Sequence, residues 1–303
     1  MEHRRAERKS VRWTVLAAVL LLCFALLVGY GDDLLPKQEP VFSGDCVRVH
    51  FLDVGQGSSV LIQSGSEGIL IDAGERACAD RVIACLNTCG VKTLRLAVAT
   101  HPHSDHVGAL PEVLQAVPTE TLLVPRLTEA NMPASYAYES LLNTVRERQI
   151  RLAAAKPGAE YTLANVSLRV LAPLEQSEDL NDMSVFCRVA AFDTVFLLPA
   201  DAGTTVQEAL LQSGEDLRCD VLQTPHHGSS GALCPPFLKA AKPRSAVISC
   251  GAGNDYGHPH SEVLQYFDRH GVKVYRTDWQ SDIVFSCYAG GFRADVAGKG
   301  VSS

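Results

Sequence analysis

The sequence predicts an α/β fold in which two strand-rich halves, each covered by helices, pack as a four-layer αββα sandwich. The first observation is that short apolar runs alternate with runs of helical spacing from Cys46 onward. The second is that this alternation occurs twice along the chain, which fits a sandwich better than one parallel sheet. The third is the composition, since 47% hydrophobic and 20% charged residues in a chain of 303 suit a packed globular body.

The first half contains strand-like runs, helical runs and a cluster of histidines. Three runs separated by turn residues come first, namely VRVHFLDVG, SSVLIQSG and GILIDAG. Helical spacing follows over residues 79–89, and the next run, LRLAVATH, is a buried strand that leads directly into the histidines. A short helix over 110–117, the strand TLLVPR and an amphipathic helix over 136–149 complete this half.

The second half has the same organisation. YTLANVSLRVLAP and MSVFCRVAAFDTVFLLPAD are predicted as strands, followed by a helix over 204–213. The strand CDVLQTPHH ends in a second pair of histidines, and a helix over 236–241 separates it from the strand AVISCG. A helix over 261–270 and the strands VKVYRTD and SDIVFSCYAGGFRADV close the body.

The N-terminus carries a candidate membrane anchor. Residues 13–30 have no charge over 18 positions and an aromatic residue at each end, and basic residues precede them. This pattern predicts a single-pass protein of the cell membrane, with a cytoplasmic N-terminus and an extracytoplasmic body. A cleaved signal peptide is the alternative, although LLVGYGDD offers no small-residue cleavage site.

Five segments follow from this interpretation. They are a basic N-terminus (1–12), a transmembrane anchor (13–30), a linker (31–45), one globular domain (46–290) and a tail (291–303).

The charge of the body argues against a general nucleic-acid binder. The chain has a formal net charge of −7, and its first twelve residues hold five basic against two acidic side chains, so the remainder carries −10. General nucleic-acid binding depends on basic residues that neutralise phosphates. Bound divalent cations would reverse the sign of the charge locally.

The ten cysteines include no C-x-x-C pair, so the spacing predicts no structural zinc site. Several cysteines lie inside apolar runs such as AVISC and IVFSC, where they are expected to be small buried side chains. Cys78, Cys85 and Cys89 are the best disulfide candidates, and the sequence does not assign a pairing.

The strongest functional signal is the segment His101-Pro102-His103-Ser104-Asp105-His106, which follows a buried strand. Imidazole and carboxylate groups this close together are good ligands for a transition metal. Asp201 and the pair His226 and His227 also follow predicted strands directly. Asp201 would alternatively cap the next helix. Ligands from separate strand ends predict a pocket for two divalent metal ions.

These motifs resemble the metallo-β-lactamase superfamily, in which H-x-H-x-D-H is followed by an Asp after a strand and by a later His. More narrowly, the sequence is similar to the hydrolase domain of ComEC-type DNA-uptake proteins over roughly 47–283. The motifs of that resemblance are FLDVGQGSSVLI, ILIDAG, THPHSDHVGAL, NDMS, LLPAD, DVLQTPHHGS and NDYGHPH. The resemblance implies that residues 46–290 form a metal-dependent hydrolase with the metallo-β-lactamase sandwich.

The resemblance also implies roles for individual residues. His101 and His103 would hold one metal, Asp105 and His106 with His226 the other, and Asp201 would bridge them. Asp72 would orient the metal-binding loop, and His227 would lie beside the pocket or fix His226. Which of His226 and His227 binds metal stays open.

The sequence departs from the superfamily at one position. The third His of the first metal site is missing, and the corresponding segment reads Asn181-Asp182-Met183-Ser184. ComEC-type domains share the Asn-x-x-Ser pattern, so Asn181 and Ser184 are candidates for the metal surroundings or substrate contact. A site with fewer imidazoles leaves zinc and manganese both open.

The expected chemistry is attack by metal-activated water on phosphorus. Asp105 and Asp201 are candidate catalytic residues through the metals. His258 would bind a phosphate oxygen or protonate the leaving group.

The resemblance favours a phosphodiesterase or nuclease, with DNA as a candidate substrate and a separate DNA-uptake channel as a candidate partner. Hydrolysis of another ester or amide, as in β-lactamases, is an alternative, and a catalytically degenerate metal-binding module is another. The sequence does not indicate the oligomeric state.

Overall fold

The computed structural model describes residues 45–129 and 131–296, all of which belong to the larger of two units of the chain, residues 44–303. The predicted anchor at 13–30, the basic N-terminus at 1–12 and nearly all of the linker lie outside these residues. Within the described part of the chain, no helix has the length and apolarity needed to cross a membrane.

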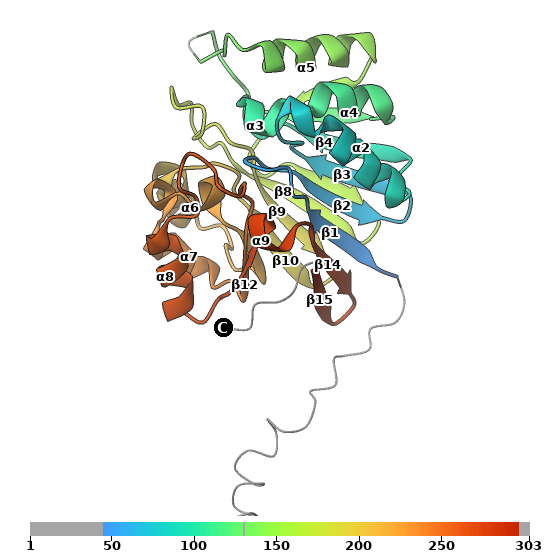
Figure 1. Ribbon diagram of the computed structural model, residues 1–303. Coiled ribbons are helices and arrows are strands. Elements are labelled where there is room, and N and C mark those ends of the chain that lie inside the picture. Colours follow the sequence, from blue (N-terminus) through green and yellow to red (C-terminus); the bar gives the residue numbers. More distant parts are fainter. Residues whose placement is uncertain (1–44, 130, 297–303) are drawn as a thin grey trace, which may run out of the picture. The chain divides into compact units, whose positions relative to one another are not determined.

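Two β-sheets form the centre of the fold (Figure 1). The first has eight strands in the order β15-β14-β1-β2-β3-β4-β5-β6. Its strands are β1 (Val47–Phe51), β2 (Val60–Ser64), β3 (Glu67–Ile71), β4 (Thr93–Val98), β5 (Thr121–Val124), β6 (Arg151–Ala154), β14 (Ile283–Tyr288) and β15 (Gly291–Val296).

The second sheet has seven strands in the order β13-β12-β11-β10-β9-β8-β7. Its strands are β7 (Glu160–Leu163), β8 (Val166–Ala172), β9 (Phe186–Ala191), β10 (Thr194–Leu198), β11 (Val221–Gln223), β12 (Ser245–Ile248) and β13 (Lys273–Arg276).

Each sheet has an antiparallel part and a parallel part. Strands β3 to β6 run parallel to one another, as do β10 to β13. Neighbouring parallel strands bring their carboxyl ends to the same edge of a sheet, and loops there can share one site. The loops after β4, β10 and β11 are therefore placed to contribute to a common site.

The main core lies between the sheets. Val47, Val49 and Phe51 alternate along β1 and are all fully buried in it, as the period of a strand requires. The Phe51 ring lies 6.4 Å from that of Phe196 and 5.9 Å from that of Phe285, measured between centroids. Aromatic side chains from both sheets thus fill the space between them.

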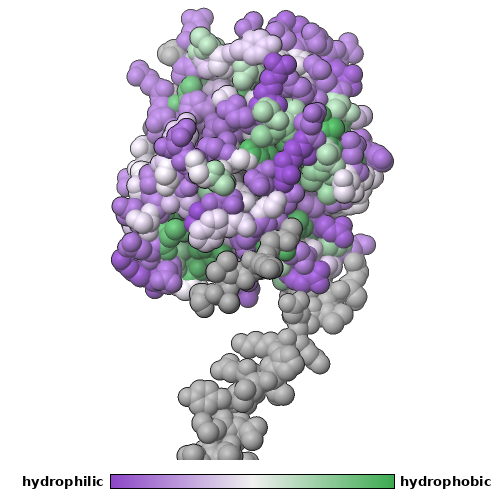
Figure 2. All heavy atoms as spheres, viewed as in Figure 1, coloured by the Kyte–Doolittle hydropathy of each residue, from purple (hydrophilic) through white to green (hydrophobic). Residues whose placement is uncertain are grey.

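Helices cover the outer face of each sheet, so the expected αββα layering is found. The first sheet packs against α2 (Ala79–Thr88), α4 (Leu110–Ala116) and α5 (Tyr136–Glu147). The second packs against α6 (Thr204–Ser213), α7 (Pro235–Ala241) and α8 (Ser261–Arg269). Figure 2 shows one face of the protein, on which hydrophilic side chains surround small hydrophobic patches. Short helices also occur at α3 (Ser104–Val107), α9 (Thr277–Gln280), η1 (Arg76–Cys78), η2 (Pro225–Gly228) and η3 (Ser230–Ala232).

One strand was not expected from the sequence, and one boundary was set too early. Strand β6 was not predicted, because it lies at a sheet edge and its side chains are largely exposed, which hides the apolar signal. Residues 291–296, which the predicted run SDIVFSCYAGGFRADV included but the list of segments assigned to the tail, form β15, the partner of β14 in a hairpin at the other edge.

Candidate metal centre

The predicted ligands lie in loops at the carboxyl ends of three strands. His101 and His103 follow β4, and the short helix α3 carries Asp105 and His106. Asp201 follows β10, and η2 after β11 carries His226 and His227. The structure brings all seven of these side chains together.

The backbone at η2 explains how two neighbouring histidines reach one site. His226 and His227 have φ values of 48° and 53°, in the left-handed region that non-glycine residues adopt at a cost of about 1–3 kcal/mol each. Their rings are inclined at 77° to each other, with centroids 6.0 Å apart. The two imidazoles therefore approach Asp201 from different directions.

A close contact with Gly57 holds the loop that carries Asp105. A Cβ atom at Gly57 would lie 2.4 Å from the Asp105 carbonyl oxygen, so only glycine fits this approach. The backbone N–H of Ser58 donates to the same oxygen at 3.1 Å. The glycine-rich segment after β1 thus contacts the loop that carries Asp105 and helps to position it.

Asp201 lies at the centre of the site with its two oxygens facing different imidazoles. Oδ1 is 3.2 Å from His106 Nε2 and 3.5 Å from His227 Nε2. Oδ2 is 3.6 Å from His226 Nε2 and 3.8 Å from His101 Nε2. One carboxylate therefore separates two pairs of imidazoles.

Asp105, His106, Asp201 and His227 form the tighter group, whose possible ligand atoms all lie within 4.8 Å of one another. Asp105 Oδ2 is 3.3 Å from His227 Nε2 and 3.8 Å from His106 Nε2. The structure thus places His227, rather than His226, beside Asp105 and His106, which differs from the expected arrangement.

Hydrogen bonds fix which imidazole nitrogens face the site. His227 Nδ1 donates to the Ser249 carbonyl oxygen at 2.8 Å, and His106 Nδ1 donates to Asp72 Oδ2 at 2.7 Å. The Nε2 atoms of these two histidines then lie only 3.3 Å apart, next to two carboxylates, and each presents a lone pair when it is deprotonated. Such a concentration of lone pairs and negative charge fits a cation between the groups.

Asp72 connects the tight group to the other pair of histidines through Thr100. The Thr100 hydroxyl donates to Asp72 Oδ2 at 2.7 Å, so its oxygen can accept from His101 Nδ1, 3.1 Å away. Ser184 Oγ lies 3.4 Å from the same nitrogen. His101 Nε2 is left to face His103 Nδ1 at 3.0 Å. Asp72 and Ser184 thus contact the histidines, as expected for residues that orient ligands.

Without a bound metal, Asp201, His106 and His227 all favour their charged forms. Burial opposes ionisation of Asp201, but His227 and His106 outweigh it and hold the pKa of this carboxyl well below its usual value. Burial also opposes the charge on His227, but Asp201 and Asp105 raise the pKa of His227 to about 9. The same balance, with Asp201 and Asp72 as partners, holds the pKa of His106 well above its usual value.

The pKa values of His101 and Asp105 are both lowered. Burial, with the charge of His106, holds the pKa of His101 well below its usual value. Against burial, the hydrogen bond from His227 and the charge of His106 lower the pKa of Asp105 to about 2. The pocket therefore holds ionised carboxylates and binds protons where a metal would otherwise be bound.

The site opens into a cavity of about 360 Å³. It is lined by Gln56, His103, Ser104, Asp105, Asn181, Asp201, His226, His227, Tyr256 and His258. Asn181 Oδ1 is buried in this lining without a hydrogen-bond partner among the described residues, so an oxygen donor is available for a bound cation or water.

His258 lines the cavity and is contacted by the Gln56 side chain. The Gly251 N–H donates to Gln56 Oε1 at 3.1 Å, which directs the Gln56 amide nitrogen toward His258 Nδ1, 3.4 Å away. Burial, with the nearby His227, lowers the pKa of His258 to about 4. The sequence-based reasoning missed Thr100 and Tyr256 as parts of the site, although Tyr256 belongs to the quoted NDYGHPH motif.

The comparisons with known proteins show the family to which the chain belongs. A family model described as "Metallo-beta-lactamase superfamily" matches residues 52–252. Competence protein ComA of Neisseria gonorrhoeae is 31% identical over 91% of this chain and 36% of its own length. ComE operon protein 3 of Bacillus subtilis is 26% identical over 78% of this chain and 33% of its own length. The chain thus spans about a third of the length of these curated relatives.

A solved structure shows the same fold. The metallo-beta-lactamase fold protein YhfI from Bacillus subtilis superposes with a TM-score of 0.53 at 14% identity, covering 80% of this chain and 100% of that one. Given the family match over residues 52–252 and the two competence relatives, the chain belongs to the metallo-β-lactamase superfamily, and its relatives are consistent with the ComEC-type branch.

Proposed function

We propose that this protein is a membrane-anchored, metal-dependent phosphodiesterase whose site takes two divalent ions, zinc or manganese. The observation that carries the proposal is the position of Asp201, whose two oxygens each face a different pair of imidazoles. A carboxylate placed in this way can bridge two metal ions, as two-metal hydrolytic sites require.

The geometry supports one change in the expected ligand sets. Asp105, His106 and His227 would hold one ion with Asp201 Oδ1, because these groups form the tight cluster. His101, His103 and His226 would hold the other with Asp201 Oδ2. His226 would then take the place of the third histidine, which the superfamily has where this chain has Asn181. The Asn181 oxygen would remain available for water or substrate.

The chemistry divides between the ions and the side chains. Bound divalent ions would supply Lewis acidity and make water nucleophilic at neutral pH. Asp72 and Thr100 hold the imidazoles in the tautomers that leave Nε2 free. Asp105, Asp201 and the five imidazoles fix the positions of the ions relative to the cavity.

His258 would bind a phosphate oxygen rather than protonate the leaving group. Its pKa of about 4 leaves the imidazole neutral near pH 7, so it is a poor proton donor. Gln56 donates toward Nδ1, which places the hydrogen of the neutral ring on Nε2. A neutral N–H can stabilise negative charge that develops on a non-bridging oxygen.

Two further observations support a nucleic-acid-like phosphodiester such as DNA. The Tyr256 side chain is 67% exposed at the cavity, and its ring stacks on His258 at 5.6 Å between centroids. An exposed aromatic face beside a metal site can stack against a base. The curated relatives are named for competence, so we further propose that the domain at 46–290 lies outside the cell, anchored by residues 13–30, and works with a DNA-uptake channel.

Metal analysis and a substrate screen on the purified full chain test the proposal. We expect ions bound at the cavity, turnover of bis-p-nitrophenyl phosphate and single-stranded DNA, and little hydrolysis of nitrocefin. Chelation should abolish the activity and added zinc or manganese should restore it. Preferential hydrolysis of nitrocefin would support an ester or amide hydrolase instead, and bound metal without turnover of any substrate would support a degenerate binding module.

A further inference from the structure

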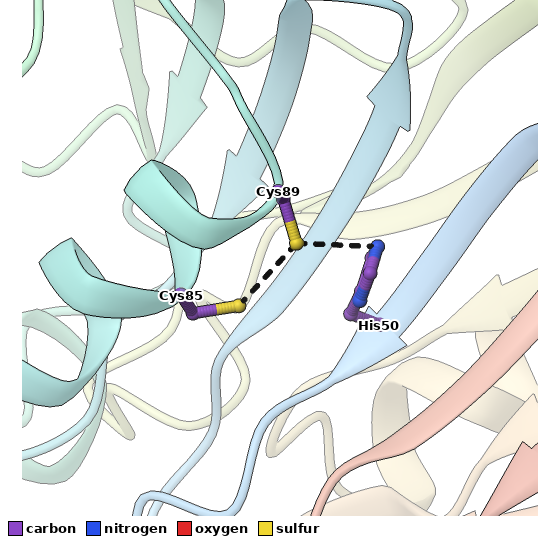
Figure 3. A group of neighbouring side chains, drawn as sticks. All are labelled: His50, Cys85 and Cys89. Carbon is purple, nitrogen blue, oxygen red and sulfur yellow. Dashed lines mark hydrogen bonds between the residues drawn. The ribbon is translucent and has the colours of Figure 1, made fainter.

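A second group of metal-binding side chains lies on the outer face of the first sheet, under helix α2. His50 on β1, Cys85 in α2 and Cys89 at the end of α2 place one possible ligand atom each within 4.8 Å of the others. Figure 3 shows the three side chains pointing toward one another from the strand and the helix. None of them lines the cavity of the candidate metal centre.

We propose that His50, Cys85 and Cys89 bind a thiophilic divalent ion, for which zinc is the reference. The proposal is independent of the hydrolase function, because it uses different residues and different ligand chemistry. Zinc binds thiolates and imidazoles, and two Cys with one His form a known three-ligand set in which water or another group takes the fourth position.

The distances fit an ion at the centre of the group. Cys85 Sγ lies 3.9 Å from Cys89 Sγ, and Cys89 Sγ lies 4.0 Å from His50 Nε2. Tetrahedral coordination at a Zn–S length of about 2.3 Å and a Zn–N length of about 2.0–2.1 Å requires separations of about 3.8 Å and about 3.6 Å. Both observed separations are within a few tenths of an ångström of these values, and the third pair, Cys85 with His50, is within 4.8 Å, so an ion would draw these two side chains somewhat closer together.

Gln63 contacts two of the three proposed ligands, His50 and Cys89. Gln63 donates from Nε2 to the Cys89 carbonyl oxygen at 2.7 Å and to that of Gly65 at 3.0 Å, which ties the end of α2 to the turn after β2.

Ion binding would exchange protons for the metal. His50 Nε2 lies 3.3 Å from Gln63 Oε1, to which it donates in the absence of an ion. An ion that binds this nitrogen and the Cys85 sulfur therefore releases their protons, as metal binding to imidazole and thiol groups generally does. The two cysteines are half-buried, so a solvent molecule can reach the fourth position.

Cobalt absorption tests this site without interference from the candidate metal centre. The reduced full chain is titrated with Co²⁺, and sulfur-to-cobalt charge transfer is followed in the near ultraviolet. The candidate metal centre has only nitrogen and oxygen donors, so it cannot produce this band. We expect a band that saturates at one equivalent of thiolate-bound cobalt and disappears when Zn²⁺ is added.

Single-atom variants identify the ligands. Cys85→Ser and Cys89→Ser should each abolish the band, whereas Cys78→Ser should retain it, because Cys78 donates to the Val54 carbonyl oxygen and stands outside the group. Phosphodiester turnover should be unchanged in all three variants. Absence of the band in the reduced wild-type chain, or its persistence in both ligand variants, would overturn the proposal.

A disulfide is the competing outcome. Peptide mass analysis of the chain purified without reductant identifies a disulfide between Cys85 and Cys89. If this disulfide is present and the reduced chain gives no cobalt band, the two cysteines are a redox pair and the metal proposal is wrong.

Discussion

Asp72 Oδ2 lies 2.7 Å from His106 Nδ1, and both side chains are fully buried. The other Asp72 oxygen accepts from the Thr100 N–H at 2.8 Å, so the carboxylate cannot rotate without losing a backbone hydrogen bond. Asp72 follows β3 and His106 lies beyond β4, so the pair connects two neighbouring parallel strands. This contact determines which His106 nitrogen is available to an ion.

Replacing Asp72 with Asn should weaken metal binding while the fold persists. The amide keeps the size of the side chain but can turn an N–H toward His106 Nδ1, which would favour the tautomer with the proton on Nε2. We expect the metal affinity to fall by about 10–100-fold, measured by calorimetric titration of the ion-free protein. Asp216→Asn, at an exposed carboxylate paired with Arg218, is the control and should bind normally. Unchanged affinity in Asp72→Asn would contradict the orienting role.

Removing single histidines should separate the two proposed ion positions. The variants are made in a Cys85→Ser/Cys89→Ser background, which removes the second proposed metal site. His227→Ala and His106→Ala should each lose one ion. The combination of His106→Ala with His227→Ala should lose no more than either substitution alone, because both imidazoles would hold the same ion. His226→Ala combined with His227→Ala should lose both ions, because the two imidazoles face different oxygens of Asp201. Metal per chain from elemental analysis checks this, with the exposed His270→Ala as control. Equal losses in both double variants would place His226 and His227 at the same ion.

The sequence revealed the ligands because they follow apolar strands. His101 comes directly after a buried run, as do Asp201 and His226, and a parallel arrangement of the strands brings their ends together. The αββα layering was also predictable, because the strand and helix periods are clear in most elements. The edge strand β6 was not, since its exposed side chains carry no apolar alternation.

The division of the ligands between the ions could not be predicted from the sequence. His226 and His227 are adjacent, and only the left-handed backbone at both residues decides which Asp201 oxygen each imidazole faces. The grouping of His50 with Cys85 and Cys89 was equally hidden. It depends on the packing of α2 across the sheet, which brings residues more than thirty positions apart into contact.

Metal uptake should strengthen as the pH rises toward 9. The ion-free protein holds a proton on His227, whose pKa is raised from 6.5 to about 9, and metal binding must displace it. Displacing the His227 proton makes the affinity rise about tenfold per pH unit below pH 9, and the proton on His106, whose pKa is also held well above its usual value, adds to this slope. Titrations of the ion-free chain between pH 6.5 and 9.5 check the slope, in buffers that do not bind metal. An affinity that is constant over this range would show that His227 is not protonated in the ion-free protein.

The core between the sheets should respond to truncation independently of the metal centre. Phe51 is fully buried and contacts the rings of Phe196 and Phe285. Phe51→Ala should lower the free energy of unfolding by about 3–5 kcal/mol, because it removes apolar contacts and leaves a cavity between the sheets. Chemical denaturation of the ion-free chain measures this, and the exposed Tyr136→Ala is the matched control with an expected change within about 0.5 kcal/mol. A loss below about 1 kcal/mol for Phe51→Ala would mean that the two sheets repack around the truncated side chain.

The role of His258 can be tested by separating hydrogen bonding from proton transfer. With a pKa of about 4, His258 is neutral from pH 6 to pH 8. Wild-type kcat should therefore show no change in this pH range that is caused by titration of His258. His258→Ala should lower kcat by about 10²-fold at unchanged metal content, because a donor to the developing charge is removed. His258→Asn keeps an N–H donor and should retain more activity than the alanine variant. If instead both variants lose activity equally, and wild-type kcat falls as the pH rises from 6 to 8, His258 acts as the proton donor to the leaving group.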